Sequence, residues 1–169
     1  MDKLLKYCLS FILFMIVFSC HKETTLSAAE KRLLAEETYS KAVQFTQGST
    51  EFQNGIVDAL AIDPNYPQGV YELSVAHLKR GMPNKWLQQY DKAVKLDSIT
   101  RIPWRGYLYL WFYRDYKKAI KDFDTSDTLT PNFIDQPQGI SVDYWRGVAY
   151  LGLKDYEQSI SFFDKYMNQ

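Results

Sequence analysis

The sequence is poor in the residues from which most active sites and metal sites are built. It contains two cysteines and two histidines in 169 residues, and they do not cluster. His77 stands alone in a helical pattern, where a packed or surface histidine is the expected role, and no Cys or His spacing is that of a zinc site. No glycine-rich loop precedes a helix to hold a phosphate. We therefore expect no enzymatic activity, no bound metal and no cofactor.

An excess of charge of either sign is also absent. Lysine plus arginine number 20, and aspartate plus glutamate number 20. Nucleic-acid binding depends on a cationic surface that neutralises phosphates, so we expect no nucleic-acid partner. Asp122, Asp124 and Asp127 lie beside several lysines, and we interpret this acidic group as one side of a solvated, charged helix face.

No apolar run is long enough for a comfortable membrane-spanning helix. Leu9–Phe18 is apolar apart from Ser10, whereas a spanning helix needs about 20 apolar residues. The run follows Lys3 and Lys6, and it has the length of the core of a signal peptide.

The end of this run resembles a bacterial lipoprotein signal. Val17–Cys20 reads as an aliphatic residue, a variable residue, a small residue and then cysteine. The resemblance implies that residues 1–19 are removed, that Cys20 carries a lipid and that 20–26 form a tether. The chain is then a membrane-anchored lipoprotein of the bacterial cell envelope, with the outer membrane favoured over the inner one. The sequence does not decide whether it faces the periplasm or the cell surface. The alternatives are an ordinary cleaved signal with an incidental cysteine, or an uncleaved anchor.

Apolar residues recur at spacings of three and four through the rest of the chain, which predicts amphipathic helices. Ser27 and Glu30 form a capping box that opens the first helix. Pro67 and Pro83 open two others, where a residue without an N–H group is favoured. No segment shows the alternation of a half-buried strand. The expected helices span about 27–46, 50–63, 67–81, 83–96, 102–113, 116–128, 141–153 and 156–167, with a loop over 132–139.

Two stretches of the second half of the chain are near copies. Trp104–Asp124 and Trp145–Asp164 share Trp-Arg-Gly, Tyr-Leu, Asp-Tyr, Ile and Phe-Asp in the same order. The first helix of the earlier copy is one residue longer, and 132–139 is an insertion between the copies. Repetition at this scale indicates stacked helical units.

These units resemble the tetratricopeptide repeat, a helix–turn–helix unit of 34 residues. Ala59 and Ala93 are separated by that period. Positions that match the family pattern are Leu73, Ala76, Gly81, Tyr90, Ala93, Val94 and Asp97 in one unit, Asp115, Tyr116, Ala119, Ile120, Phe123 and Pro131 in the next, and Gly147, Ala149, Tyr150, Asp155, Tyr156, Ile160 and Phe163 in the last. The resemblance implies an all-α fold, an α–α superhelix of about four helix–turn–helix repeats that fills 27–169. The repeats would span about 27–66, 67–99, 100–131 and 140–169.

The Trp-Arg-Gly motifs and nearby aromatics are the candidates for binding. Arg105 and Arg146 occupy a position where the family has a buried leucine. One interpretation is structural, with each arginine bound to an aspartate on an adjoining helix and each tryptophan packed under the next unit. The other is a binding groove, because Trp, Tyr and Arg dominate binding surfaces. The candidate partner-binding residues are Tyr71, Trp104, Arg105, Tyr107, Trp111, Tyr144, Trp145 and Arg146.

Two functional hypotheses follow. The first, implied by the resemblance, is a lipid-anchored adaptor or scaffold that binds a protein or peptide in the bacterial envelope. The second is a lipoprotein that binds a small ligand or a glycan on an aromatic groove. Only a long loop such as 132–139, folded over the groove, could enclose such a ligand. The oligomeric state stays open.

Overall fold

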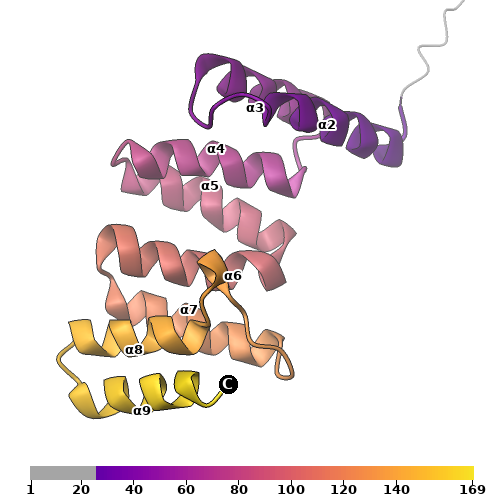
Figure 1. Cartoon of the computed structure of the whole chain (residues 1–169). Coiled ribbons are helices and arrows are strands. Elements are labelled where there is room, and N and C mark those ends of the chain that lie inside the picture. The colour runs from indigo at the N-terminus through magenta and orange to yellow at the C-terminus, as the bar shows by residue number, and fades with distance from the viewer. Residues whose placement is uncertain (1–25) are drawn as a thin grey trace, which may run out of the picture.

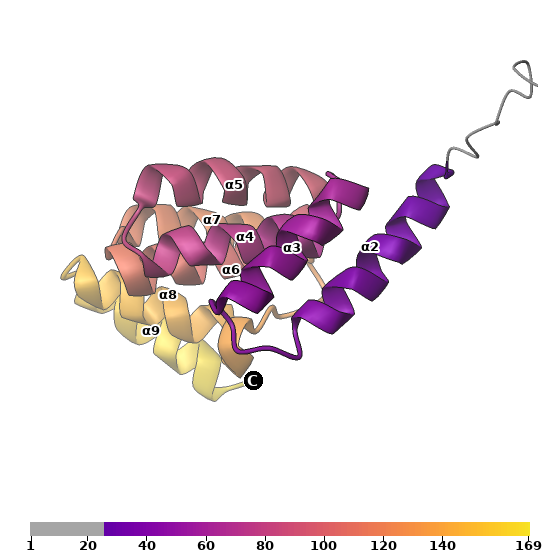
Figure 2. The ribbon, with the colours of Figure 1, turned by 90° about the horizontal axis from the view of Figure 1, so that it is seen from above.

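A computed structural model of the protein describes residues 26–169. In this range the chain forms eight α-helices and no strand, and consecutive helices pair antiparallel and stack on one another (Figure 1). Seen from above, the first pair crosses the others at an angle, so the stack twists (Figure 2). The helices are α2 (Ala28–Ala42), α3 (Thr50–Ile62), α4 (Pro67–Lys79), α5 (Pro83–Leu96), α6 (Ser98–Leu108), α7 (Tyr116–Leu129), α8 (Val142–Gly152) and α9 (Tyr156–Met167). The predicted all-α superhelix of helix–turn–helix repeats is confirmed, while the apolar run and Cys20 lie outside the described residues.

Local side-chain caps set several helix starts. At α2 the Ser27 N–H donates to the Glu30 carboxylate at 2.8 Å, and the Glu30 N–H donates to the Ser27 hydroxyl at 3.3 Å. Asp97, Asp115 and Asp155 precede α6, α7 and α9, and each carboxylate accepts a backbone N–H three residues later at 3.2 Å. These bonds satisfy N–H groups that have no partner within the helix.

The helix predicted for 102–113 begins at Ser98, four residues earlier than expected. Asp97 caps it, and Pro103 lies inside α6. Proline is disfavoured inside a helix because it lacks an N–H and crowds the preceding turn. Here the cap and the burial of Ile102 and Pro103 outweigh that cost.

A π-helical turn, η1 (Tyr109–Tyr113), continues α6. The N–H of Asp115 donates to the carbonyl of Tyr109, six residues back, at 3.0 Å. At the matching point of the last unit the N–H of Asp155 donates to the carbonyl of Tyr150, five residues back, also at 3.0 Å. The extra residue of the earlier Trp-Arg-Gly copy is therefore absorbed as a wider turn. Single π turns of this kind are frequent at functional sites.

Small residues allow the two helices of a pair to approach closely. A Cβ on Gly106 would lie 2.7 Å from a ring carbon of Phe123, and one on Gly147 would lie 2.6 Å from Phe163. Four helix-contact alanines are fully buried: Ala59, Ala93, Ala119 and Ala149. The larger core cluster runs from α4 to α8 and contains aromatic side chains such as Trp86 and Tyr90. Part of the aromatic content therefore serves packing between units.

Candidate functional site

A groove of about 240 Å³ lies between α4 and α6. It is lined by Tyr71, Val75, Leu78 and Lys79 from α4, Trp104, Tyr107 and Leu108 from α6, Trp111 and Phe112 from η1, and Gln47 and Gln138 from two connecting segments. Figure 1 shows the segment after α7 crossing in front of α6, which brings the short 3-10 helix η2 (Pro137–Gly139) to the groove. Eight of the eleven lining residues are apolar or aromatic, two are glutamines, and Lys79 is the one charged residue.

Helical spacing aims these side chains into the groove. Tyr71, Val75 and Leu78 are separated by four and three residues, so they share one face of α4. The π turn then changes the direction of the chain after α6, and Trp111 is left 62% exposed at its edge. The wider turn therefore presents a large apolar side chain to solvent instead of burying it.

The groove aromatics contact one another in a continuous row. Tyr107 stacks on Trp111 with ring centroids 6.2 Å apart and an interplanar angle of 13°. Tyr107 also contacts Trp104 edge-on at 6.2 Å and Trp145 at 5.1 Å. On the α4 side of the groove, the ring centroid of Tyr71 lies 4.4 Å from the guanidinium of Arg101. Burial raises the pKa of Tyr71 to about 12, so this phenol stays protonated and can donate a hydrogen bond.

The inserted segment is held in place by its own polar contacts. The Trp145 indole N–H donates to the carbonyl of Pro137 at 3.0 Å. The Asp135 carboxylate accepts from the hydroxyls of Ser126 and Thr130. Gln138 adopts a left-handed backbone conformation with φ of 60°, which is uncommon for a residue with a side chain. These contacts hold the inserted segment against the helices, and Gln138 is the residue of the insertion that lines the groove.

Arg105 lies in an ion pair between helices and does not line the groove. Its Nε and one terminal nitrogen donate to the two oxygens of Asp122 on α7, and the other terminal nitrogen donates to Asp91 on α5 at 2.7 Å. Burial raises the pKa of the Asp122 carboxyl while the hydrogen bonds from Arg105 lower it, and burial is the larger effect. The hydrogen bond to Asp122 in turn raises the pKa of the guanidinium. One arginine thus joins three successive helices.

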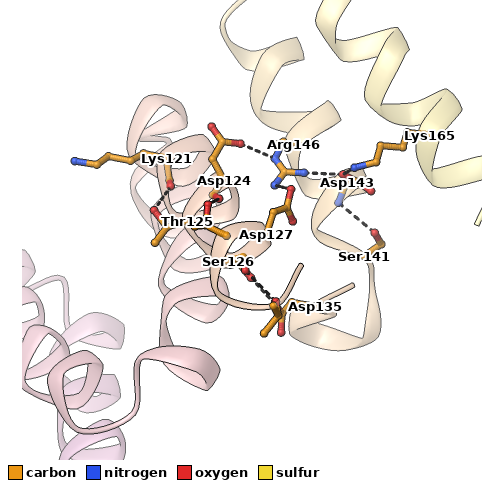
Figure 3. Close-up of polar contacts among 12 residues, drawn as sticks. Lys121, Asp124, Thr125, Ser126, Asp127, Asp135, Ser141, Asp143, Arg146 and Lys165 are labelled. Atoms are coloured by element: carbon orange, nitrogen blue, oxygen red, sulfur yellow. Dashed lines mark hydrogen bonds and ion pairs between the residues drawn. The ribbon is translucent and has the colours of Figure 1, made fainter. Parts of the chain in front are cut away.

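Arg146 occupies the equivalent place one unit later (Figure 3). Its side chain is 1% exposed and donates to Asp124 at 3.0 Å, to Asp127 at 2.6 Å and to Asp143 at 2.6 Å. Asp143 also accepts from Lys165 of α9 at 2.9 Å. The cluster therefore joins α7, α8 and α9 and matches the structural interpretation of the Trp-Arg-Gly motif.

The acidic group on α7 is only in part the solvated face that we expected, because Asp124 and Asp127 are exposed but Asp122 is buried. Asp122 is 6% exposed at the side chain and binds Arg105, while Asp124 and Asp127 bind Arg146. The sequence places these aspartates beside lysines, but their partners are arginines 17 to 22 residues away. Proximity in sequence was therefore a poor guide to these ion pairs.

The eight predicted site residues thus fall into separate places. Four of them line the groove: Tyr71, Trp104, Tyr107 and Trp111. Trp145 is buried behind the groove and holds the insertion, and Tyr144 packs against Phe163 and Tyr166 of α9. Sequence reasoning missed the other seven lining residues, which are Gln47, Val75, Leu78, Lys79, Leu108, Phe112 and Gln138, and the insertion at 132–139 was the one signal for Gln138.

Two further structural findings concern residues 26–169 as a whole. No group of three or more His, Cys, Asp or Glu side chains in this range is arranged to hold a metal ion. No helix of the same range has the length and apolar character needed to cross a membrane.

Comparison with known proteins agrees with the stacked helical pairs. A family model described as a tetratricopeptide repeat matches residues 144–168, which cover most of α8 and all of α9. The chain is 28% identical over 110 residues to the small glutamine-rich tetratricopeptide repeat-containing protein 2 of Saccharomyces cerevisiae. The match covers 62% of this chain and 29% of that protein, so the chain spans less than a third of its relative. Residues 144–168 are thus similar to a tetratricopeptide repeat, and the stacked helical hairpins of residues 26–169 are consistent with repeats of this kind.

Proposed function

We propose that the protein is a non-catalytic interaction module whose aromatic groove holds a segment of a partner protein. The observation that carries this proposal is the π turn after α6, which leaves Trp111 and Phe112 exposed beside a row of aromatic rings. Large apolar side chains at a groove are the residues that contribute most to protein binding. Similarity to tetratricopeptide repeats, which the relative's printed name also mentions, favours a protein partner as well.

The size and polarity of the groove indicate what kind of partner peptide it can hold. Its volume of about 240 Å³ is below the range of about 300–1,000 Å³ that is typical of small-molecule pockets. It therefore suits one or two side chains of a peptide better than a whole ligand. The amide of Gln138 can exchange hydrogen bonds with a peptide backbone, whereas the Gln47 amide already donates to Glu72 and accepts from Lys79. The charge of Lys79 favours an acidic or neutral segment.

Selection from a random peptide library on the full chain in detergent tests this proposal. The affinities of the selected peptides are then measured for the wild type, for Trp111→Ala and for Phe133→Ala. Phe133 is as exposed as Trp111 but lies outside the groove. We expect Trp111→Ala to weaken binding about tenfold or more and Phe133→Ala to leave it unchanged. Equal affinities for all three proteins would contradict a peptide site in the groove.

A second candidate function is the binding of a small ligand or glycan. The contribution of Gln138 to the lining favours it, because the insertion reaches the groove from one side. Aromatic faces beside amide groups can hold a sugar ring. Binding of an oligosaccharide in an array, lost in Trp111→Ala, together with failure to select any peptide, would favour this candidate over the first.

We also propose that the module is anchored in the bacterial envelope through a lipid on Cys20, with the outer membrane favoured. The support is the sequence around Cys20, with an apolar run before it and a polar stretch after it. A tether at 20–26 then joins the anchor to the helical repeats.

A further inference from the structure

The polar groups that line the aromatic groove are mostly hydrogen-bond donors. No aspartate or glutamate is among its eleven lining residues, all of which lie within residues 26–169. An indole N–H group or a lysine ammonium group can only donate. The amide of Gln47 is already used, because it donates to Glu72 at 2.9 Å and accepts from Lys79 at 2.6 Å. Apart from the phenols, the amide oxygen of Gln138 is then the side-chain acceptor that remains for a ligand.

Four donors of the groove have no acceptor within the described part of the chain. The phenol or indole group of each forms no hydrogen bond to residues 26–169, and none of the four side chains is buried: Tyr71, Trp104, Tyr107 and Trp111. Burial of part of the ring raises the pKa of Tyr71 to about 12 and also raises the pKa of Tyr107. Both phenols therefore keep the proton that they can donate. The groove complements a ligand that is rich in acceptor oxygens and poor in N–H groups.

The aromatic rings of the groove present both faces and edges to a ligand. Tyr107 and Trp111 are nearly parallel, with an interplanar angle of 13°, whereas Trp104 stands at 84° to Tyr107. A proline ring can pack on such surfaces without losing side-chain entropy, because it has almost none to lose. Aromatic-lined grooves hold proline-rich segments in other folds for the same reason.

The backbone conformation of a bound segment decides how well it fits these donors. A helix pairs its carbonyl groups internally, and an extended strand carries an N–H group for each carbonyl. A polyproline II segment has no internal hydrogen bonds, so its carbonyls are free, and its prolines have no N–H group. We propose that the groove binds a proline-rich segment of a partner protein in the polyproline II conformation. Its carbonyl oxygens accept hydrogen bonds from the free indole and phenol groups, and its proline rings pack on Trp104, Tyr107 and Trp111.

Such a ligand is one class of the partner segment in the proposed function, so the inference rests on that function. Two requirements distinguish it from other apolar peptides. The segment has the left-handed polyproline II backbone, and the N–H and O–H donors of the groove contribute to its affinity as well as the ring surfaces. A groove that selected only for apolar surface would have neither requirement.

Two polyproline peptides of about ten residues, one of L-proline and one of D-proline, test the first requirement. They have the same atoms and the same apolar area, but their helices have opposite hands. Each carries the same fluorophore, and its binding to the full chain in detergent is measured by fluorescence anisotropy. We expect saturable binding of the L-peptide that is about tenfold tighter, or more, than binding of the D-peptide.

Conservative substitutions test the second requirement. Tyr107→Phe removes one phenol group and Trp111→Phe removes one indole N–H group, while an aromatic ring stays in each place. Each change should weaken binding of the L-peptide about threefold to tenfold. Tyr144→Phe is the matched control and should leave the affinity unchanged, because Tyr144 packs on α9 outside the groove.

Equal binding of the two polyproline peptides, or binding of neither, overturns the inference. Full affinity of the L-peptide for both Phe variants overturns it too, as does L-peptide binding that survives Trp111→Ala and therefore lies outside the groove. The library peptides of the proposed function separate the two failures. If library peptides without proline bind and lose affinity in Trp111→Ala, the groove still holds a peptide, of another backbone conformation. If no library peptide binds either, the proposed function fails as well.

Discussion

The Arg105 guanidinium donates two parallel hydrogen bonds to the Asp122 carboxylate, each 2.8 Å long, across the α6–α7 pair. Bidentate pairs of this kind are among the stronger polar contacts in proteins. Their value depends on both partners, because a buried charge without its partner is costly. The arginine of the Trp-Arg-Gly motif, which the sequence offered as a candidate binding residue, thus links helices of neighbouring repeats.

Removing the buried partner should destabilise the fold strongly. We expect Asp122→Ala to lower the free energy of unfolding by about 3 kcal/mol, at the low end for a broken buried pair, because Arg105 then keeps only the half-exposed Asp91 as a partner. Asp124→Ala is the matched control, since the Asp124 side chain is exposed and Arg146 keeps two other aspartates; it should cost about 1 kcal/mol or less. Urea unfolding of both variants measures the difference. Similar losses in the two would contradict a special role for the Asp122 pair.

Gly106→Ala should destabilise the protein, although this change usually favours a helix. Alanine in a helix interior ordinarily gains about 1 kcal/mol over glycine. Here the new methyl group would lie 2.7 Å from the ring of Phe123, which is fully buried and has no room to move. We expect a net loss of about 1–3 kcal/mol in thermal unfolding. The same change made in a Phe123→Leu background should cost less, and a raised Tm for the single variant would show that the helices are not in close contact there.

The buried carboxyl of Glu72 should make the free energy of unfolding depend on pH. Burial raises the pKa of its carboxyl, although the hydrogen bond from Gln47 and the charges of Arg101 and Lys79 lower it. A carboxyl with a raised pKa binds its proton more tightly in the folded state. Its contribution to stability is therefore full below the ordinary pKa and is lost as the pH rises through the folded-state value.

Glu72→Gln removes that charge but keeps an acceptor for Gln47. We expect the variant to be at least as stable as the wild type near pH 7 and to lose its advantage near pH 4. Chemical unfolding at the two pH values measures this, with the exposed Glu51→Gln as the control. A variant that is less stable than the wild type near neutral pH would contradict the assignment.

Deleting Phe112 should convert the π turn after α6 into the tighter turn of the last unit. The deletion removes the extra residue of the Trp-Arg-Gly copy and so leaves the cap at Asp115 intact. We expect a cooperative thermal transition to persist and the affinity for groove-selected peptides to fall about tenfold, because Trp111 changes its direction. Peptide affinity equal to that of the wild type would show that the π turn does not shape the site.

Cys20→Ser tests the membrane anchor. If Cys20 carries a lipid, the substitution should abolish labelling with a radioactive or clickable fatty acid, and it should release the protein from membranes or block its processing. Cys8→Ser is the matched control and should leave labelling unchanged, because Cys8 lies in the segment that we expect to be removed. A labelled, membrane-bound Cys20→Ser protein would contradict lipidation at this position.

The sequence by itself determined the helical pairs, because their causes are local. The caps at Ser27, Asp115 and Asp155 act over three residues, and the apolar spacing acts over one or two helical turns. The repeat was visible because each unit must bury the same face against its neighbour. The start of α6 was not predicted correctly, because a proline such as Pro103 disfavours a helix when only neighbouring residues are considered. The burial of Pro103 in the folded protein offsets this cost.

The tertiary structure alone decided what the arginines and the insertion do. The neighbouring sequence does not determine whether an arginine side chain lies in solvent, in a groove or in an ion pair. The choice depended on Asp91 and Asp122, which lie 14 and 17 residues from Arg105 in the sequence and meet it only when three helices stack. Gln138 likewise reaches the groove only because the Pro137 carbonyl accepts a hydrogen bond from the indole of Trp145 on the following helix. Such contacts join distant segments, and their energies appear only when the fold excludes water from both partners.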